Sequence, residues 1–264
     1  MKRISIIYII AFFVISCADE PKYPSKGFTV NNSSPEEGQA VNKTGIQPDS
    51  VVFNSRPNGV LLTAYPQHRL IPIYKLNIRV NDDDDTTYYT GRNSFYSGYS
   101  RYENIDGNNW NHNFMPGFEA MYGYNLININ YYNSNTQKTT KFFKKPVLIK
   151  TLYYPTDSKD TLNGEAVLRD YYMVSAYNKD SNKDGYINTD DLRRFFLFDL
   201  DGAMNMQLIP DNYSVISSQF DPFNDHMYVY AAFDENKNGH QDETEQVHVF
   251  RIELKSPKKG VRLY

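Results

Sequence analysis

The sequence repeats one segment without a gap, and this repeat restricts the possible folds more than any other feature. Residues 180–200 align with residues 234–254 at a constant offset of 54 (234 − 180). Each copy begins with an acidic loop that contains Asn and Gly, and continues into an apolar segment. A repeat of this length indicates similar units that stack on one another or are arranged radially around an axis. The identical pairs are Asp180/Asp234, Asn182/Asn236, Lys183/Lys237, Gly185/Gly239, Phe196/Phe250 and Leu200/Leu254.

Short runs rich in Tyr, Phe, Ile and Val surround both copies, and Asn, Asp, Gly and Pro bound them. This composition and punctuation predict β-strands. Beyond the first 16 residues, no stretch keeps the spacing of an amphipathic helix. We therefore expect a mainly β fold of antiparallel units, which could be a sandwich, a barrel or a propeller. The expected strands are 214–220, 227–233, 247–254 and 260–264 in the last unit, and 147–154, 171–177, 194–200 and 204–209 in the preceding one.

Two short patterns resemble the blades of TolB-type β-propellers. They are Phe-Asp-Leu-Asp-Gly at 198–202, followed by Gln-Leu-Ile-Pro at 207–210, and the Pro-containing turn at 220–225. The resemblance covers about residues 147–264 and implies propeller-like units. A repeat of 54 residues divides residues 51–264 into about four units, the low end for a closed propeller. Residues 51–123 contain no clear copy, so an open or irregular β-fold is the alternative.

The acidic part of each copy has the spacing of a calcium loop. Ca²⁺ takes six to eight oxygen ligands, and its twelve-residue loops use positions 1, 3, 5, 7, 9 and 12, with Gly at 6 and a backbone carbonyl at 7. The two loops read DSNKDGYINTDD at 180–191 and DENKNGHQDETE at 234–245. The candidate ligands are Asp180, Asn182, Asp184, Tyr186, Asn188 and Asp191 in the first loop, and Asp234, Asn236, Asn238, His240, Asp242 and Glu245 in the second.

Both loops resemble the EF-hand loop, and the first also resembles the loop of dockerin modules. Position 8, which is apolar in EF-hands and pairs two loops, fits at Ile187 but not at Gln241. Asp191 is one methylene shorter than the usual Glu at position 12. Because the flanks are β-branched and alternating, we expect calcium loops inserted in β-hairpins, with helix–loop–helix pairs as the alternative. The first loop, with three carboxylates at ligand positions 1, 5 and 12, should bind more tightly than the second.

The N-terminal residues predict a membrane anchor. A basic start precedes an apolar run at 4–15, which is too short to span a bilayer but has the length of a signal-peptide core. The run ends in Val-Ile-Ser-Cys17, which resembles the lipobox of bacterial lipoproteins. The resemblance implies removal of residues 1–16, acylation of Cys17, and a lipid-anchored protein at the outer membrane or cell surface. Residues 17–50, rich in Pro, Ser and Asn, would form a flexible tether, and residues 51–264 a calcium-binding β-domain.

Charge and composition exclude several functions. The net charge of −3 argues against nucleic-acid binding, and a single Cys rules out a disulfide framework. No nucleophile elbow, P-loop or dinucleotide fingerprint occurs. The Tyr-rich stretch 88–109 suits a protein or glycan ligand, or is simply a Tyr-rich β surface. The expected function is a non-enzymatic binding or structural module, and the alternatives are a surface hydrolase acting on glycan or peptide and a dockerin-like scaffold partner.

Overall fold

The computed structural model describes residues 27–29, 55–80, 86–89, 93–95, 115–123, 125–156 and 161–264. Within these ranges all regular structure is antiparallel β-sheet, which confirms the predicted mainly β class. No helix suited to crossing a membrane occurs in the same ranges. The leader 1–16, Cys17, nearly all of the tether 17–50 and most of the Tyr-rich stretch lie outside the described residues.

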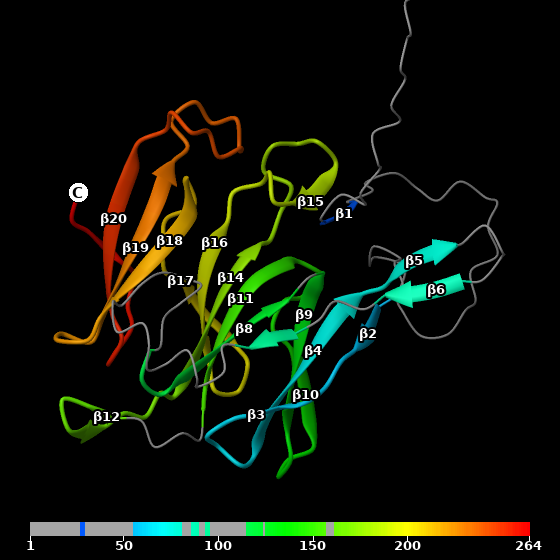
Figure 1. Cartoon of the computed structure of the whole chain (residues 1–264), viewed down its shortest axis with the longest axis vertical. Helices are drawn as coiled ribbons and strands as arrows, with labels where there is room; N and C mark the ends of the chain where they lie inside the picture. Colours follow the sequence, from blue (N-terminus) through cyan, green and yellow to red (C-terminus); the bar gives the residue numbers. More distant parts are fainter. Residues whose placement is uncertain are drawn as a thin grey trace, which may run out of the picture.

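Three larger sheets lie side by side (Figure 1). The N-terminal sheet has the order β10 (Lys138–Lys141), β9 (Leu126–Asn133), β4 (His68–Lys75), β2 (Ser55–Pro57), with β3 (Leu61–Leu62) also on β4. The middle sheet has the order β17 (Met204–Gln207), β16 (Arg194–Asp199), β14 (Tyr171–Tyr177), β11 (Leu148–Pro155), β8 (Phe118–Gly123), β7 (Asn93–Phe95). The C-terminal sheet has the order β18 (Tyr213–Asp221), β19 (His226–Phe233), β20 (Val247–Glu253), β21 (Val261–Arg262).

Three two-stranded pairs complete the described structure. They are β1 (Gly27–Thr29) with β15 (Tyr186–Asn188), β5 (Asn77–Val80) with β6 (Thr86–Tyr89), and β12 (Thr161–Leu162) with β13 (Glu165–Ala166). The strand β1 comes from the segment that the sequence predicts to be a tether. It pairs antiparallel with β15, and Phe28 lies opposite Ile187.

The strands expected in the two repeat units are present. The C-terminal sheet contains the four predicted strands of the last unit, and the middle sheet contains the four of the preceding unit. The middle sheet is larger than expected, because β8 and β7 extend it beyond β11. In the part of the chain that the structure describes, the three larger sheets keep free edges and do not close into a ring.

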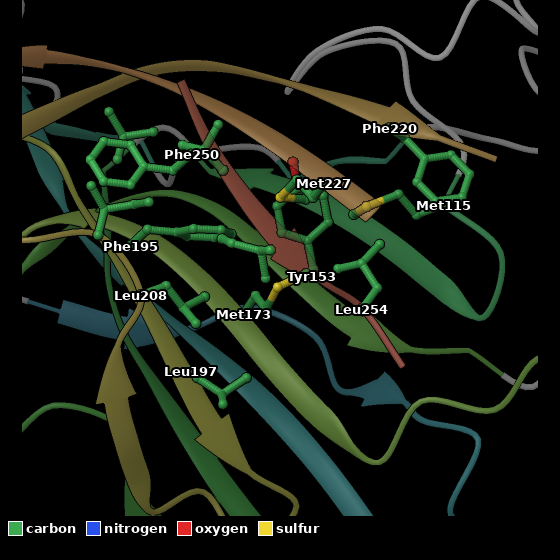
Figure 2. Packing of buried hydrophobic residues seen from close by; sticks show 14 of the residues in the cluster. Met115, Tyr153, Met173, Phe195, Leu197, Leu208, Phe220, Met227, Phe250 and Leu254 are labelled. Atoms are coloured by element: carbon green, nitrogen blue, oxygen red, sulfur yellow. The ribbon is translucent and has the colours of Figure 1, made fainter. Parts of the chain in front are cut away.

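The middle sheet is buried on both faces, which explains the almost continuous apolar run of β16. Successive side chains of a strand point to opposite faces. Phe195 and Leu197 therefore pack towards the C-terminal sheet, and Phe196 and Phe198 pack towards the N-terminal sheet. Figure 2 shows the first of these two cores, in which side chains from the middle and C-terminal sheets meet.

A buried ion pair connects the segment before β14 in the middle sheet to the β18–β19 turn of the C-terminal sheet. Arg169, which precedes β14, is 2% exposed and donates two parallel hydrogen bonds to Asp225 in the β18–β19 turn, at 2.7 and 2.6 Å. The same guanidinium donates to the carbonyl oxygens of Pro116 (3.1 Å) and Leu254 (3.0 Å). It also lies 5.6 Å from the ring centroid of Phe118. One side chain thus connects four segments of the chain.

Candidate calcium loops

The two acidic loops close hairpins of neighbouring sheets. Loop 1 (residues 180–191) joins β14 to β16 in the middle sheet, and loop 2 (residues 234–245) joins β19 to β20 in the C-terminal sheet. Both lie at the same end of the molecule (Figure 1). The strands on either side confirm the predicted insertion in β-hairpins rather than in helix–loop–helix pairs.

The first and last positions of each loop hold its backbone in the same way. At position 1, Asp180 accepts a hydrogen bond from the Gly185 N–H at 3.0 Å, and Asp234 accepts one from the Gly239 N–H at 3.2 Å. At position 12 the carboxylate accepts from the N–H of position 9. These bonds are Asn188 N–H to Asp191 at 2.9 Å and Asp242 N–H to Glu245 at 3.2 Å.

The side chains at positions 3, 5 and 9 converge in both loops. In loop 1, the amide groups of Asn182 and Asn188 both donate to Oδ2 of Asp184, at 3.2 Å each. In loop 2 the carboxylate stands at position 9 instead of 5. Oδ2 of Asp242 accepts from the amide groups of Asn236 at 3.0 Å and Asn238 at 2.8 Å.

Local backbone turns reinforce this convergence. The position 3 amide oxygen accepts from the N–H of position 5, at 3.0 Å in loop 1 and 2.9 Å in loop 2. The position 5 side chain accepts from the N–H of position 7, at 2.8 Å in both loops. Position 4 and the Gly at position 6 have positive φ in both loops. The two loops therefore share a conformation as well as a sequence pattern, and in each the side chains of positions 3, 5 and 9 are joined by hydrogen bonds.

In loop 2, two buried carboxylate oxygens receive no hydrogen bond from the described residues. They are Oδ1 of Asp234 and Oε1 of Glu245, at positions 1 and 12. Asp234 is only 7% exposed. Burial raises the pKa of Glu245, the N–H of Asp242 lowers it, and the charges of Asp234 and Asp242 raise it further. Buried acceptors normally accept a hydrogen bond. These two oxygens are therefore the place in loop 2 where a donor or a cation could bind.

Loop 1 holds its terminal carboxylate differently. Asp191 is 1% exposed. Burial raises its pKa, while hydrogen bonds from the N–H groups of Asn188, Ser181 and Asn182 lower it. The shortest of these bonds is Ser181 N–H to Oδ1 of Asp191, at 2.6 Å. The shorter side chain at position 12 is thus bound to the start of its own loop.

The loops also contact each other, although not through position 8. Ile187 at position 8 of loop 1 lies in β15 and pairs with Phe28 of β1, and the Gln241 side chain accepts a hydrogen bond from Ser214 at 3.2 Å. One of the contacts that join the loops is instead a β-bridge between Asp191 and His240. The sequence correctly indicates that Gln241 does not suit the EF-hand type of pairing, but it does not predict the contact that replaces it.

Two further residues near the loops were not predicted from the sequence. Ser181 at position 2 donates its hydroxyl to the Gly239 carbonyl at 2.6 Å. Arg194 is buried beside both loops and donates to the Tyr213 carbonyl at 2.7 Å. Burial lowers the pKa of Arg194, and the charges of Asp211, Asp234 and Asp191 oppose this shift. The only sequence signal for a buried Arg194 was its position next to an apolar run. Charged residues are rarely buried without partners, so this signal was weak.

The candidate calcium ligands include Asn side chains and backbone carbonyls, and so do not form a metal site made only of acidic side chains and histidines. Within the described ranges, no group of three His, Cys, Asp or Glu side chains could hold a metal ion. Calcium loops of this spacing take part of their ligands from Asn side chains and backbone carbonyls. No protein-family model matches the chain, and no curated protein is significantly similar to it in sequence. A proposal about function therefore depends on the geometry of the loops.

Proposed function

We propose that this protein is a lipid-anchored module of the cell envelope, a binding or structural protein whose β-domain is stabilised by Ca²⁺ in loops 1 and 2. The observation that carries the proposal is the pair of buried carboxylate oxygens of Asp234 and Glu245, to which no described residue donates a hydrogen bond. A buried acceptor without a donor costs about 1–3 kcal/mol, and more when it is charged. A cation between positions 1 and 12 would remove this cost.

The ligands would be the candidate side chains at positions 1, 3, 5, 9 and 12 of each loop, together with the backbone carbonyl at position 7. In loop 2, Asp234 and Glu245 would supply carboxylates, Asn236 and Asn238 amide oxygens, and His240 its backbone carbonyl. Asp242 would act at position 9. In loop 1 the corresponding residues are Asp180, Asp191, Asn182, Asp184, Tyr186 through its carbonyl, and Asn188. Bound calcium would neutralise carboxylates that otherwise repel one another, and would hold both hairpins rigid.

Calcium should therefore raise the melting temperature of the protein. At a Kd of about 10⁻⁴ M, usual for extracellular modules, about 10 mM Ca²⁺ stabilises the folded state by about 2.7 kcal/mol per site. Asp180→Ala should remove more of this gain than Asp234→Ala, because loop 1 has more carboxylates at ligand positions. The double variant should lose nearly all of it. Thermal melts with Ca²⁺ and with chelator measure these differences.

Magnesium is the control for this experiment, since it demands a stricter octahedral geometry and should stabilise the protein less. Identical melting curves with calcium and with chelator would leave both acidic loops as ordinary solvated turns. A separate affinity pull-down from cell-envelope extracts, with the protein as bait and with or without Ca²⁺, would identify a protein or glycan ligand.

The membrane anchor is proposed from the lipobox. Cys17→Ser should release the protein from the detergent phase into the aqueous phase, because it removes the acylated residue on which stable anchoring depends. Phase partitioning of the wild-type chain and of this variant measures the effect. Continued partitioning of Cys17→Ser with membranes would contradict the lipoprotein proposal.

We also propose that the middle and C-terminal sheets are propeller-like units. Two features support this: both contain the four strands of the repeat, and their apolar faces pack against each other. The Asp-x-Asp-Gly pattern lies in the tight turn between β16 and β17, where the Gly202 N–H donates to the Asp199 carbonyl at 2.9 Å. This is the hairpin position that the TolB-type resemblance implies.

A further inference from the structure

We propose that loops 1 and 2 bind calcium as one coupled unit, joined through Ser181 and Gly239, so that an ion in either loop raises the affinity of the other. This inference rests on the proposed calcium function, and adds to it a route of communication between the two sites. The loops belong to different sheets, so coupled binding would also fasten the middle sheet to the C-terminal sheet.

The contact between the loops is unusually close. A Cβ atom built on Gly239 would lie 1.9 Å from the Ser181 carbonyl oxygen and 2.9 Å from the Asn182 nitrogen. Only a residue without a side chain allows the two backbones to approach in this way. The Ser181 hydroxyl donates to the Gly239 carbonyl at 2.6 Å. The Gly at position 6 of loop 1 makes no such approach, because a Cβ on Gly185 would meet nothing within 4 Å.

A second contact lies beside the first. His240 forms the β-bridge with Asp191, and its Nδ1 lies 2.7 Å from the Asp190 carbonyl oxygen. Nδ1 therefore donates to this carbonyl. The last turn of loop 1 is thus fixed to position 7 of loop 2, whose backbone carbonyl is a candidate ligand. Both contacts join the loops at positions other than the position 8 pair of EF-hands.

The contacts form a continuous chain between a ligand position of one loop and a ligand position of the other. Asp191 at position 12 of loop 1 accepts from the Ser181 N–H at 2.6 Å. Ser181 binds the Gly239 carbonyl. The Gly239 N–H in turn donates to Asp234 at position 1 of loop 2, at 3.2 Å. Asp234 is the buried carboxylate whose Oδ1 receives no hydrogen bond within the described ranges.

Coupling follows from this chain because each ion would order residues that the other ion also needs ordered. An ion that immobilises Asp191 also restricts Ser181 and, through it, the turn that positions Asp234. The second ion then loses less conformational entropy on binding, which is positive cooperativity without a change of fold. Linkage requires the effect to be reciprocal, and couplings of this kind commonly change affinity by about 5- to 150-fold.

The experiment is a calorimetric calcium titration of the full chain in detergent. Asp180→Ala leaves loop 2 as the single site, and Asp234→Ala leaves loop 1. The coupling factor is the product of the two binding constants of the wild type, divided by the product of the constants of these two variants. We expect a factor of about ten. Repeating the three measurements with Ser181→Ala added should reduce the factor to about one or two.

Two variants serve as controls. Glu235 is the position 2 residue of loop 2 and is exposed, so Glu235→Gln should leave the factor unchanged. Ser181→Thr keeps the hydroxyl, and should retain coupling. Because any direct effect of Ser181→Ala on loop 1 appears in both the coupled and the single-site measurement, it cancels in the ratio.

The outcomes separate the two proposals. Absence of calcium binding by the wild type would overturn the proposed function and the coupling together. Binding of two ions with a factor of one would overturn the coupling alone. If the coupling factor is unchanged in Ser181→Ala, and circular dichroism shows that this variant is folded, the two sites are not coupled through Ser181 and Gly239. If Ser181→Ala does not fold, loss of coupling in His240→Ala supports the contact between the loops, and retention of the full factor overturns it.

Discussion

Replacement of Arg169 by Ala should lower the free energy of unfolding by about 3–5 kcal/mol, the usual cost of breaking a buried ion pair from one side. The guanidinium is almost completely buried, and donates both to Asp225 and to two backbone carbonyls. Its removal would leave the Asp225 carboxylate without its bidentate partner, and the Pro116 and Leu254 carbonyls without this donor. Urea-induced unfolding of the wild type and the variant measures the difference.

A double-mutant cycle separates the ion pair from the other contacts of Arg169. Asp225→Ala should also destabilise the protein, and the double variant should cost clearly less than the sum of the single variants, since neither charge is then left alone. Arg251 is the matched control, because it is an exposed arginine on β20. Arg251→Ala should change stability by no more than about 0.5 kcal/mol. An equally small effect of Arg169→Ala would contradict the structural role assigned to this side chain.

The sequence was sufficient to predict the local parts of the fold. The strands of the last two units and the hairpin position of both loops follow from short apolar runs and turn residues, which act over a few neighbouring positions. The order of ligand positions was equally visible, because Asp180 to Asp191 and Asp234 to Glu245 keep the same spacing. The structure adds that the two loops also share their hydrogen bonds.

Contacts between distant segments could not be predicted in the same way. The strand β4 pairs with β9, and β1 pairs with β15. In neither pair does the sequence of one strand indicate which strand is its partner. The repeat shows that Ser181 and Gly239 lie in equivalent loops, but not that these loops touch. Arginine is usually a surface residue. Arg169 and Arg194 are buried only because neighbouring sheets pack around them. These contacts depend on tertiary structure rather than on local preference.

Gly239→Ala should destabilise the protein far more than Gly185→Ala, although both glycines occupy position 6 of their loops. Both have positive φ, +74° for Gly239 and +87° for Gly185. An Ala in this left-handed conformation costs about 1–2 kcal/mol. For Gly185 this is the whole expected cost, because the added Cβ meets no other atom.

At Gly239 the added Cβ would overlap the Ser181 carbonyl oxygen, and backbone atoms of loop 1 cannot move aside as a flexible side chain could. The loops would have to separate, which breaks the Ser181–Gly239 hydrogen bond and the bridge between Asp191 and His240. Together with the backbone strain, we expect a loss of about 4 kcal/mol, at the high end for a single substitution. Urea-induced unfolding of both variants in chelator measures the difference without a contribution from bound ions. Equal losses for the two alanine variants would show that the loops do not interlock in solution, and would remove the physical basis for coupled calcium binding.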